Sequence, residues 1–197
     1  MEVNIFGEGA VGYKNIVKSS SSQDFFLYKK YKNYAVCTVA DGHSMDVFKY
    51  SHIGSYLACQ SVFEILKTYK LNEDIEKGEQ NFICDLKNKK VQNDIKNKWR
   101  DLVYREFYKR NYKVYKLDYM LFGTTLSFVI FLKEYIVFFN LGDSSILIKE
   151  DKDYVNVFKN NNFKFVNSLA LYNCEEKMQY SILKMNKDFK LVISTDG

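Results

Sequence analysis

The sequence predicts an α+β protein in which largely antiparallel sheets carry helices grouped on one face. Three observations lead to this class: strand-like runs near the start, helical periodicity through the middle, and further strand-like runs towards the end. The chain has 197 residues, of which 47% are hydrophobic and 17% aromatic, enough apolar material for one large core. Disordered chains have low hydrophobicity, the opposite of this composition, so we expect the chain to fold. Its length leads us to expect that residues 1–197 form a single domain.

The first third of the chain contains three predicted strands. Short strands are expected at Glu2–Phe6 and Asp24–Lys29, separated by a loop rich in glycine and serine. The run Tyr34–Ala40 (YAVCTVA) is apolar and β-branched, which is typical of a strand buried on both faces. It ends abruptly at Asp41-Gly42, a dipeptide that favours turns.

Helical spacing replaces the strand pattern from Asp46 to Tyr69, and Ser44 is a plausible N-cap for this helix. Leu71–Gln80 is polar and is interpreted as a loop. A second helix is predicted at Asp85–Tyr112. Its apolar residues lie roughly on one stripe, namely Leu86, Val91, Ile95, Trp99, Leu102 and Phe107.

The second predicted helix is also the most basic part of the chain. Of the net charge of +5, residues 85–116 contribute 11 Lys+Arg against 4 Asp+Glu, or +7. Such a segment is either a solvated helix face or a surface that meets an anionic partner. We expect no nucleic-acid partner, because the segment lacks a recognisable reading motif and interleaved aromatics on its basic face. By spacing, Trp99 faces the core, and Lys96, Lys98 and Arg100 flank it or face solvent.

Strand-like runs return after Gly123, at Thr124–Leu132, Tyr135–Asn140, Ser145–Lys149, Tyr154–Phe158, Tyr180–Met185 and Phe189–Thr195. The last two runs are expected to pair with each other around the polar turn at 186–188. The final strand runs directly into Asp196-Gly197. A buried strand normally has something after it to cover it, so we expect the domain to be incomplete at its C-terminus.

Cysteine and histidine usage limits the chemistry that the chain can perform. The four cysteines are all more than 20 residues apart, which excludes CxxC zinc or redox spacing, and two histidines exclude a His-rich metal site. The N-terminus has no secretory pattern, and the most apolar region, Thr125–Ile148, is broken by charges and cannot span a bilayer. We expect a reduced, cytoplasmic protein without a membrane partner.

Four short motifs place an aspartate at the end of an apolar strand: Asp24, Asp41, Asp143 and Asp196. An isolated Asp-Gly at a strand end is commonly a turn. Several carboxylates that converge, however, repel one another and raise each other's pKa, and a hard cation such as Mg²⁺ or Mn²⁺ relieves this repulsion. Two such ions about 3.5–4 Å apart can activate a water and clamp a phosphoryl group. The four motifs together therefore favour a metal site.

The motifs resemble those of the metal-dependent (PPM, type 2C) serine/threonine protein phosphatases over nearly the whole chain. The matching segments are Gln23-Asp24, Val39–His43 (VADGH), Gly123–Thr125 (GTT), Asn140–Ser144 (NLGDS) and Ser194–Gly197 (STDG). The segment Tyr50–Ser55 is similar to one that follows the DGH motif in a bacterial subgroup.

The resemblance implies a central β-sandwich flanked by helix pairs, and a site with two Mg²⁺ or Mn²⁺ ions. Asp41 would bridge both metals, and the Gly42 carbonyl would bind one of them. Asp196 would ligate the other metal, and Asp24 would act mainly through metal-bound water. A metal-bridging hydroxide would attack phosphorus directly, without a phosphoenzyme. His43 would be the general acid for the leaving seryl or threonyl oxygen.

The chain departs from the family pattern at several positions. Ser44 and Met45 replace the small glycines that usually follow DGH. The arginine that usually binds the substrate phosphate is absent, and Lys18 is the nearest cation, so weaker phosphate binding is expected. Asp118 is a candidate ligand for a third metal. The family's C-terminal Asp-Asn motif would lie beyond Gly197, so feeble turnover is expected of the 197 residues alone.

The function implied is that of a Mg²⁺/Mn²⁺-dependent serine/threonine phosphatase (EC 3.1.3.16) in signal transduction. Its substrate would be a phosphoprotein, and a cognate serine/threonine kinase is a further candidate partner. The alternative is a catalytically silent phosphatase-like domain that binds a phosphoprotein or a partner kinase.

Overall fold

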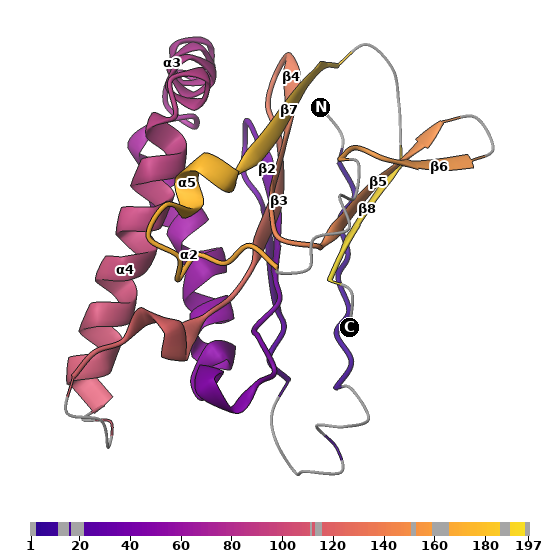
Figure 1. Ribbon diagram of the computed structural model, residues 1–197. Coiled ribbons are helices and arrows are strands. Elements are labelled where there is room, and N and C mark those ends of the chain that lie inside the picture. Colours follow the sequence, from indigo (N-terminus) through magenta and orange to yellow (C-terminus); the bar gives the residue numbers. More distant parts are fainter. Residues whose placement is uncertain are drawn as a thin grey trace.

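Two antiparallel sheets pack against each other, and helices cover the far face of the larger sheet (Figure 1). The computed structural model describes residues 3–11, 16, 22–110, 112, 116–150, 153–158, 166–185 and 190–195. The elements in chain order are β1 (Phe25–Lys30), β2 (Ala35–Ala40), η1 (Asp46–Phe48), α2 (Ser51–Thr68), α3 (Ile75–Lys87), α4 (Lys90–Arg110), η2 (Tyr119–Phe122), β3 (Leu126–Phe131), β4 (Tyr135–Leu141), β5 (Ser145–Glu150), β6 (Asp153–Asn156), α5 (Cys174–Lys177), β7 (Gln179–Lys184) and β8 (Leu191–Ser194).

The larger sheet has the strand order β1-β2-β3-β4-β7, and the smaller sheet has the order β6-β5-β8. Every strand pair in both sheets is antiparallel. The predicted α+β class, with antiparallel sheets and helices grouped on a face, is therefore confirmed.

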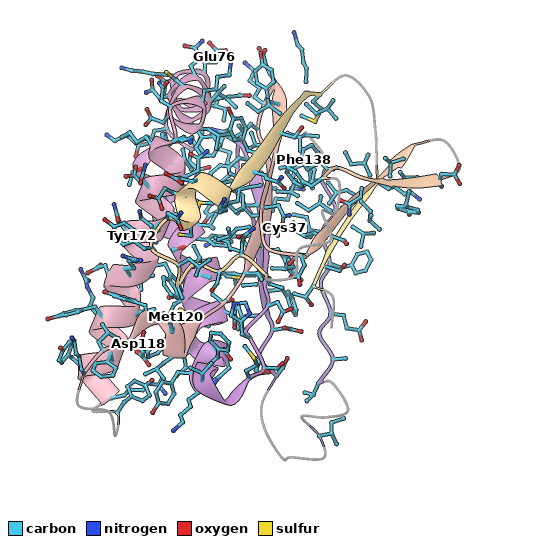
Figure 2. All side chains as sticks on the ribbon, in the orientation of Figure 1. Cys37, Glu76, Asp118, Met120, Phe138 and Tyr172 are labelled. Carbon is cyan, nitrogen blue, oxygen red and sulfur yellow. The ribbon has the colours of Figure 1, made fainter. Side chains whose placement is uncertain are left out.

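The central strands β3 and β4 are buried on both faces, which explains why their sequences are almost continuously apolar. Alternate residues enter two separate cores. The core beneath the helices takes Leu126, Phe128, Ile130, Val137 and Phe139. The core between the two sheets takes Val129, Phe131, Ile136 and Phe138, the last of which is labelled in Figure 2.

The first helical segment begins later than the sequence predicts. Residues Asp46–Phe48 form only a short 3-10 turn, and α2 starts at Ser51 after Tyr50. The backbone N–H of Tyr50 donates to the Leu121 carbonyl at 2.7 Å, which draws this stretch towards η2 instead of into the helix. The prediction that Ser44 caps the helix is therefore wrong.

The prediction of one helix at Asp85–Tyr112 is also wrong, because two helices occupy this region. Helix α3 begins inside the predicted loop, where the Asp74 side chain accepts a hydrogen bond from the Lys77 N–H at 3.1 Å. The break between α3 and α4 contains Lys89, whose φ of 60° is left-handed and interrupts helical geometry.

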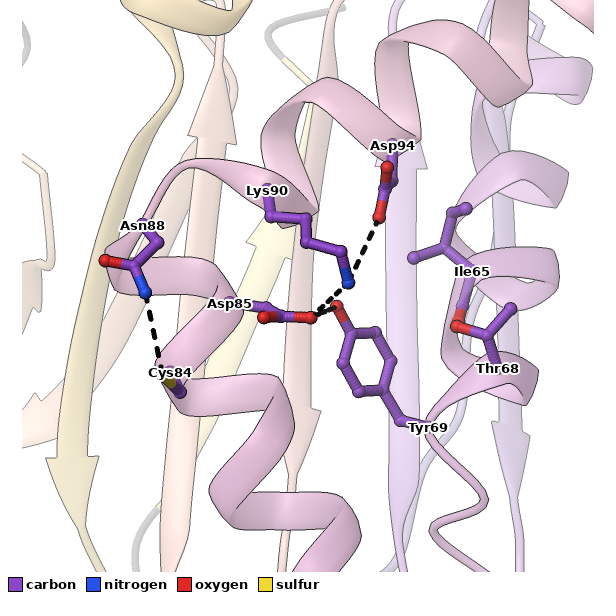
Figure 3. Close-up of polar contacts among 8 residues, drawn as sticks. All are labelled: Ile65, Thr68, Tyr69, Cys84, Asp85, Asn88, Lys90 and Asp94. Atoms are coloured by element: carbon purple, nitrogen blue, oxygen red, sulfur yellow. Dashed lines mark hydrogen bonds and ion pairs between the residues drawn. The ribbon is translucent and has the colours of Figure 1, made fainter.

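A polar network ties the two helices and the end of α2 together (Figure 3). The Asp85 carboxylate accepts a hydrogen bond from the Tyr69 hydroxyl at 3.0 Å and pairs with Lys90. Lys90 also lies 4.0 Å from Asp94 one turn along α4. The network therefore spans the end of α2, the end of α3 and the first turns of α4.

Helix α4 buries Trp99 completely, and its indole N–H donates to the Gly54 carbonyl of α2 at 3.0 Å. Ile95 is also buried, and Leu102 packs against the same core, so the predicted core stripe is confirmed at these positions. Several basic residues of this helix are engaged by neighbours: Lys96 with Glu175, Arg105 with Asp101, Arg110 with Glu106, and Arg100 with the Leu171 carbonyl. These contacts lie within α4 or join α4 to the segment 171–175.

Two predicted strand features differ in the structure. The predicted pair of final strands separates: β7 joins β4 in the large sheet, whereas β8 joins β5 in the small sheet. Local turn signals cannot reveal this, because both strands have suitable partners elsewhere. The predicted strand at Glu2–Phe6 is also not formed in residues 3–6; instead Val3 and Ile5 pack against the core between the sheets.

Among the residues that the structure describes, no helix is long and apolar enough to cross a membrane.

The buried Glu79 on α3 gives a first testable prediction. Its carboxylate accepts hydrogen bonds from the N–H groups of Glu134 and Tyr135 at 3.1 Å each, and burial raises its pKa. A raised pKa in the folded state means that this group stabilises the fold while protonated, and that the contribution is lost as pH rises through the folded-state pKa. Glu79→Gln removes the titration but keeps an acceptor oxygen.

The free energy of urea unfolding, measured for both proteins between about pH 4.5 and 8, tests this sign. The stability of wild type minus that of Glu79→Gln should fall as pH rises. The exposed Glu73→Gln is the control and should leave the pH profile nearly unchanged. A difference that grows with pH would show that the two backbone hydrogen bonds outweigh burial.

Candidate active site and metal centre

The candidate site lies where strand ends of both sheets meet. The antiparallel pairing places four strand ends together at one end of the large sheet. These are the start of β1, the end of β2, the start of β3 and the end of β4. The start of β5 and the end of β8 are paired in the small sheet, and β5 follows β4 after a three-residue turn. The described residues of the QD, DGH, GTT, GDS and STDG motifs fall on these ends.

Asp24 and Asp41 occupy opposite positions on neighbouring strands. Phe25, the first residue of β1, pairs with Ala40, the last residue of β2, and the aspartates extend that register by one position. Both side chains are half-buried. Carboxylate oxygens are the ligands that hard divalent cations prefer, so two aspartates at neighbouring strand ends suit such an ion.

The small sheet reaches the same place through Thr195. This residue directly follows β8, and its hydroxyl donates to the Asp24 carboxylate at 3.3 Å. The contact joins residues 171 positions apart in sequence. It brings the chain immediately before Asp196 against Asp24.

The backbone of Asp41 is held by the two threonines of the GTT segment. Its N–H donates to the Thr125 hydroxyl at 2.9 Å. Its carbonyl accepts from the Thr125 N–H and from the Thr124 hydroxyl, each at 2.9 Å. Three hydrogen bonds therefore fix the position of this residue, and they explain why two successive threonines stand here.

Gly42 lies where no side chain has room. A Cβ atom would stand 2.6 Å from the Gln23 carbonyl and 2.9 Å from the backbone of Ser51. The Gln23 amide donates to the His43 carbonyl at 3.1 Å and to the Ser51 hydroxyl at 3.2 Å. The glutamine of the QD motif thus fastens the DGH loop to the start of β1 and to α2, a role that sequence reasoning missed.

His43 is half-buried and lies two residues after Asp41 in sequence. Its backbone N–H donates to the Gly123 carbonyl at 3.2 Å, and its ring lies 4.7 Å from the ring of Phe48. Burial lowers the pKa of the imidazole below its ordinary value. The contacts hold the ring in place on the loop that follows Asp41.

The GDS segment is shaped by a glycine in a left-handed conformation. Gly142 has φ of 120°, and a Cβ there would stand 2.5 Å from the methyl group of Thr125. Its carbonyl accepts from the Asn140 amide at 3.3 Å. Asp143 is half-buried next to it. The end of β4 is therefore packed directly against the segment that holds Asp41.

The structure does not place three of the predicted site residues at this site, two of which it does not describe. Lys18 and Asp196 lie outside the described residues, so their roles stay predictions. Asp118 accepts a hydrogen bond from the Met120 N–H at 2.9 Å and caps η2, on the helical side of the large sheet (Figure 2). The structure thus gives the candidate third-metal ligand a capping role.

Sequence reasoning also missed Ser168, which is 3% exposed. Its hydroxyl accepts from the Thr124 N–H at 3.1 Å and donates to the Thr124 carbonyl at 3.2 Å. No pattern in the sequence singles it out, because an isolated serine before an apolar pair is typical of a turn.

The site offers the type of ligand atom that a hard divalent cation binds. The carboxylates of Asp24 and Asp41 and the carbonyl of Gly42 are oxygen ligands, which Mg²⁺ and Mn²⁺ prefer. Within the described ranges, no group of three or more His, Cys, Asp or Glu side chains stands ready to hold a metal ion. The two described carboxylates would therefore need further oxygen ligands.

Solved structures with the same fold include proteins described as serine/threonine phosphatases. RsbX in complex with magnesium has a TM-score of 0.51 at 16% identity over 90% of this chain and 67% of that chain. The catalytic domain of the phosphatase PstP with two manganese ions has a TM-score of 0.53 at 12% identity, over 88% and 70%. The S. agalactiae serine/threonine phosphatase has a TM-score of 0.54 at 18% identity, over 90% and 74%.

No curated protein matches the sequence. The family pattern described as Protein phosphatase 2C, however, matches residues 11–197. That range includes every motif that gathers at the strand ends described above. The chain belongs to the protein phosphatase 2C family.

Proposed function

We propose that this chain acts as a Mg²⁺- or Mn²⁺-dependent phosphatase of phosphoserine and phosphothreonine in proteins, with residues 1–197 forming one catalytic domain. The observation that carries the proposal is the placement of Asp24 and Asp41 at opposite positions, with Thr195 hydrogen-bonded to Asp24. Membership of the family supports protein phosphatase function in general, and the arrangement of these residues supports the choice of site.

The residues that would hold the metals are Asp41, the Gly42 carbonyl and Asp196, with Asp24 acting through water. The relatives crystallised with magnesium or manganese support the choice of these ions. When bound, the two cations supply an activated water and neutralise charge on the phosphoryl group. The contact of Thr195 with Asp24 supports Asp196 as a further ligand, because Asp196 is the next residue.

The chain's own residues have separate tasks in this proposal. Asp41 is positioned through its backbone, so its carboxylate can be presented to metal without rearrangement of the strand end. His43 is the proposed proton donor to the seryl or threonyl oxygen as that oxygen leaves; because burial lowers its pKa and favours the neutral imidazole, this role is served better as pH falls. Lys18 supplies positive charge for the substrate phosphate. As a point charge it holds phosphate less firmly than the planar fork of an arginine.

The proposed substrate class is a phosphoprotein, and a cognate serine/threonine kinase is the proposed partner. The proposed location is the cytoplasm, where such a kinase and substrate would have to be present.

Asp41→Asn tests the metal site directly. The amide keeps the size of the side chain but removes the charge that binds a cation, so Mn²⁺ affinity and Mn²⁺-dependent turnover should both be lost. Isothermal titration of Mn²⁺ and hydrolysis of a phosphothreonine peptide measure the two effects. The exposed Asp153→Asn, on β6, makes the same chemical change far from the motif and should behave as wild type.

Wild-type chain that binds the phosphopeptide but shows no detectable hydrolysis at saturating Mn²⁺, not even the feeble turnover expected of the 197 residues, would contradict the proposed activity. That result would identify the chain as a silent phosphatase-like domain.

His43→Gln tests the general-acid role through the leaving group. A phosphoserine peptide releases a strongly basic alkoxide that needs a proton, whereas p-nitrophenyl phosphate releases a stable phenolate. We expect kcat to fall by about 10²- to 10⁴-fold for the peptide and by much less for p-nitrophenyl phosphate. Equal losses on both substrates would place His43 in binding or folding and not in proton transfer.

A further inference from the structure

Ser168 is a buried polar residue whose contacts lead to the candidate site. Its hydroxyl accepts from the N–H groups of Thr124 at 3.1 Å and Ala170 at 3.3 Å, and donates to the Thr124 carbonyl at 3.2 Å. The next residue, Leu169, donates its N–H to the same carbonyl at 2.9 Å. Both backbone groups of Thr124 are therefore fixed by one short segment.

The side chain of Thr124 contacts Asp41. The Thr124 hydroxyl donates to the Asp41 carbonyl at 2.9 Å, and the neighbouring Thr125 completes the other two hydrogen bonds to Asp41. A shift of Thr124 would therefore be passed to Asp41 through direct contacts. Ser168 lies 44 residues from Thr124 in sequence, so local chain connectivity does not impose this arrangement.

Ser168 is itself anchored to the helical layer. The segment that follows it leads into α5, which lies against α4 (Figure 1). The Arg100 guanidinium donates to the Leu171 carbonyl at 3.4 Å, and Lys96 forms a half-buried ion pair with Glu175 at 2.8 Å. The serine can thus transmit the position of the helices to the strand end.

We propose that Ser168 is a positioning residue for the metal centre: its hydroxyl fixes Thr124, and Thr124 fixes Asp41. The inference rests on the proposed function in so far as Asp41 binds metal. Without the hydroxyl, the buried Thr124 N–H would lose its acceptor. An unsatisfied buried N–H costs free energy, so Thr124 would shift towards another acceptor. Because a ligand misplaced by about 1 Å can cost on the order of 100-fold in rate, small movements of Thr124 matter.

The first experiment needs no enzymatic activity. Amide hydrogen exchange is followed residue by residue in wild type, Ser168→Ala and Ser61→Ala. Ser61 is the matched control: it is equally buried, but its hydroxyl donates only to Ala58 within α2, at 2.7 Å. In Ser168→Ala, we expect the N–H groups of Thr125 and Asp41 to exchange roughly tenfold faster, since about one net hydrogen bond of local stability is lost.

These two amides are informative because neither is bonded to Ser168. A merely structural serine would alter only its own partners, Thr124 and Ala170, and exchange confined to those two amides would overturn the proposal. If Ser168→Ala does not fold, Ser168→Cys fills the same space with a weaker hydrogen-bonding group and allows the same comparison.

The second experiment measures Mn²⁺ binding by isothermal titration. Residues that orient metal ligands typically change metal affinity or activity by about 10- to 100-fold when mutated. We expect a loss in that range for Ser168→Ala, little change for Ser61→Ala, and recovery in Ser168→Thr, which keeps the hydroxyl. Unchanged Mn²⁺ affinity in Ser168→Ala, with wild type binding normally, would refute the positioning role.

The two proposals fail in different ways. If wild type shows no turnover but Ser168→Ala still loosens Thr125 and Asp41, the positioning role stands and the proposed activity falls. If wild type is active and Ser168→Ala retains its kcat and its Mn²⁺ affinity, the activity stands and the positioning role falls.

Discussion

The hydrogen bonds that hold the Asp41 backbone are the constraint on which the candidate site depends. Strands β2 and β3 pair regularly as far as Val39 and Ser127, and beyond that point the two threonine side chains take over. The bonds use the N–H and the carbonyl of Asp41, not its carboxylate. The backbone of Asp41 thus fixes its position, and its carboxylate supplies the proposed metal ligand.

The two cores make this strand end rigid, because β3 and β4 are buried on both faces. Phe128 and Phe139 stack beneath the helices with ring centroids 4.3 Å apart, whereas Phe138 lies between the sheets. A strand enclosed on both sides cannot shift its register without exposing a whole row of apolar side chains. The start of β3, where Thr124 and Thr125 hold the Asp41 backbone, is therefore kept in place by residues far from the site.

The sequence predicted most strands well, because apolar runs and Asp-Gly turns are local signals. It failed where a decision depended on distant partners. The break at Lys89 has no glycine or proline to mark it, and the separation of β7 from β8 depends on which sheet each strand joins. Ser168 was missed for the same reason, since its importance arises only from its contact with Thr124.

The two described aspartates of the site are held in different ways. Asp41 depends on the central strands of the large sheet, whereas Asp24 precedes the edge strand β1 and is contacted by Thr195 at the end of the small sheet. The spacing of the two carboxylates therefore depends first on the pairing of β1 with β2 within the large sheet, and the small sheet adds the Thr195 contact to Asp24. Phe138 and Ile146 lie in the core between the sheets, so they help to hold the small sheet, and Thr195 with it, against the large one.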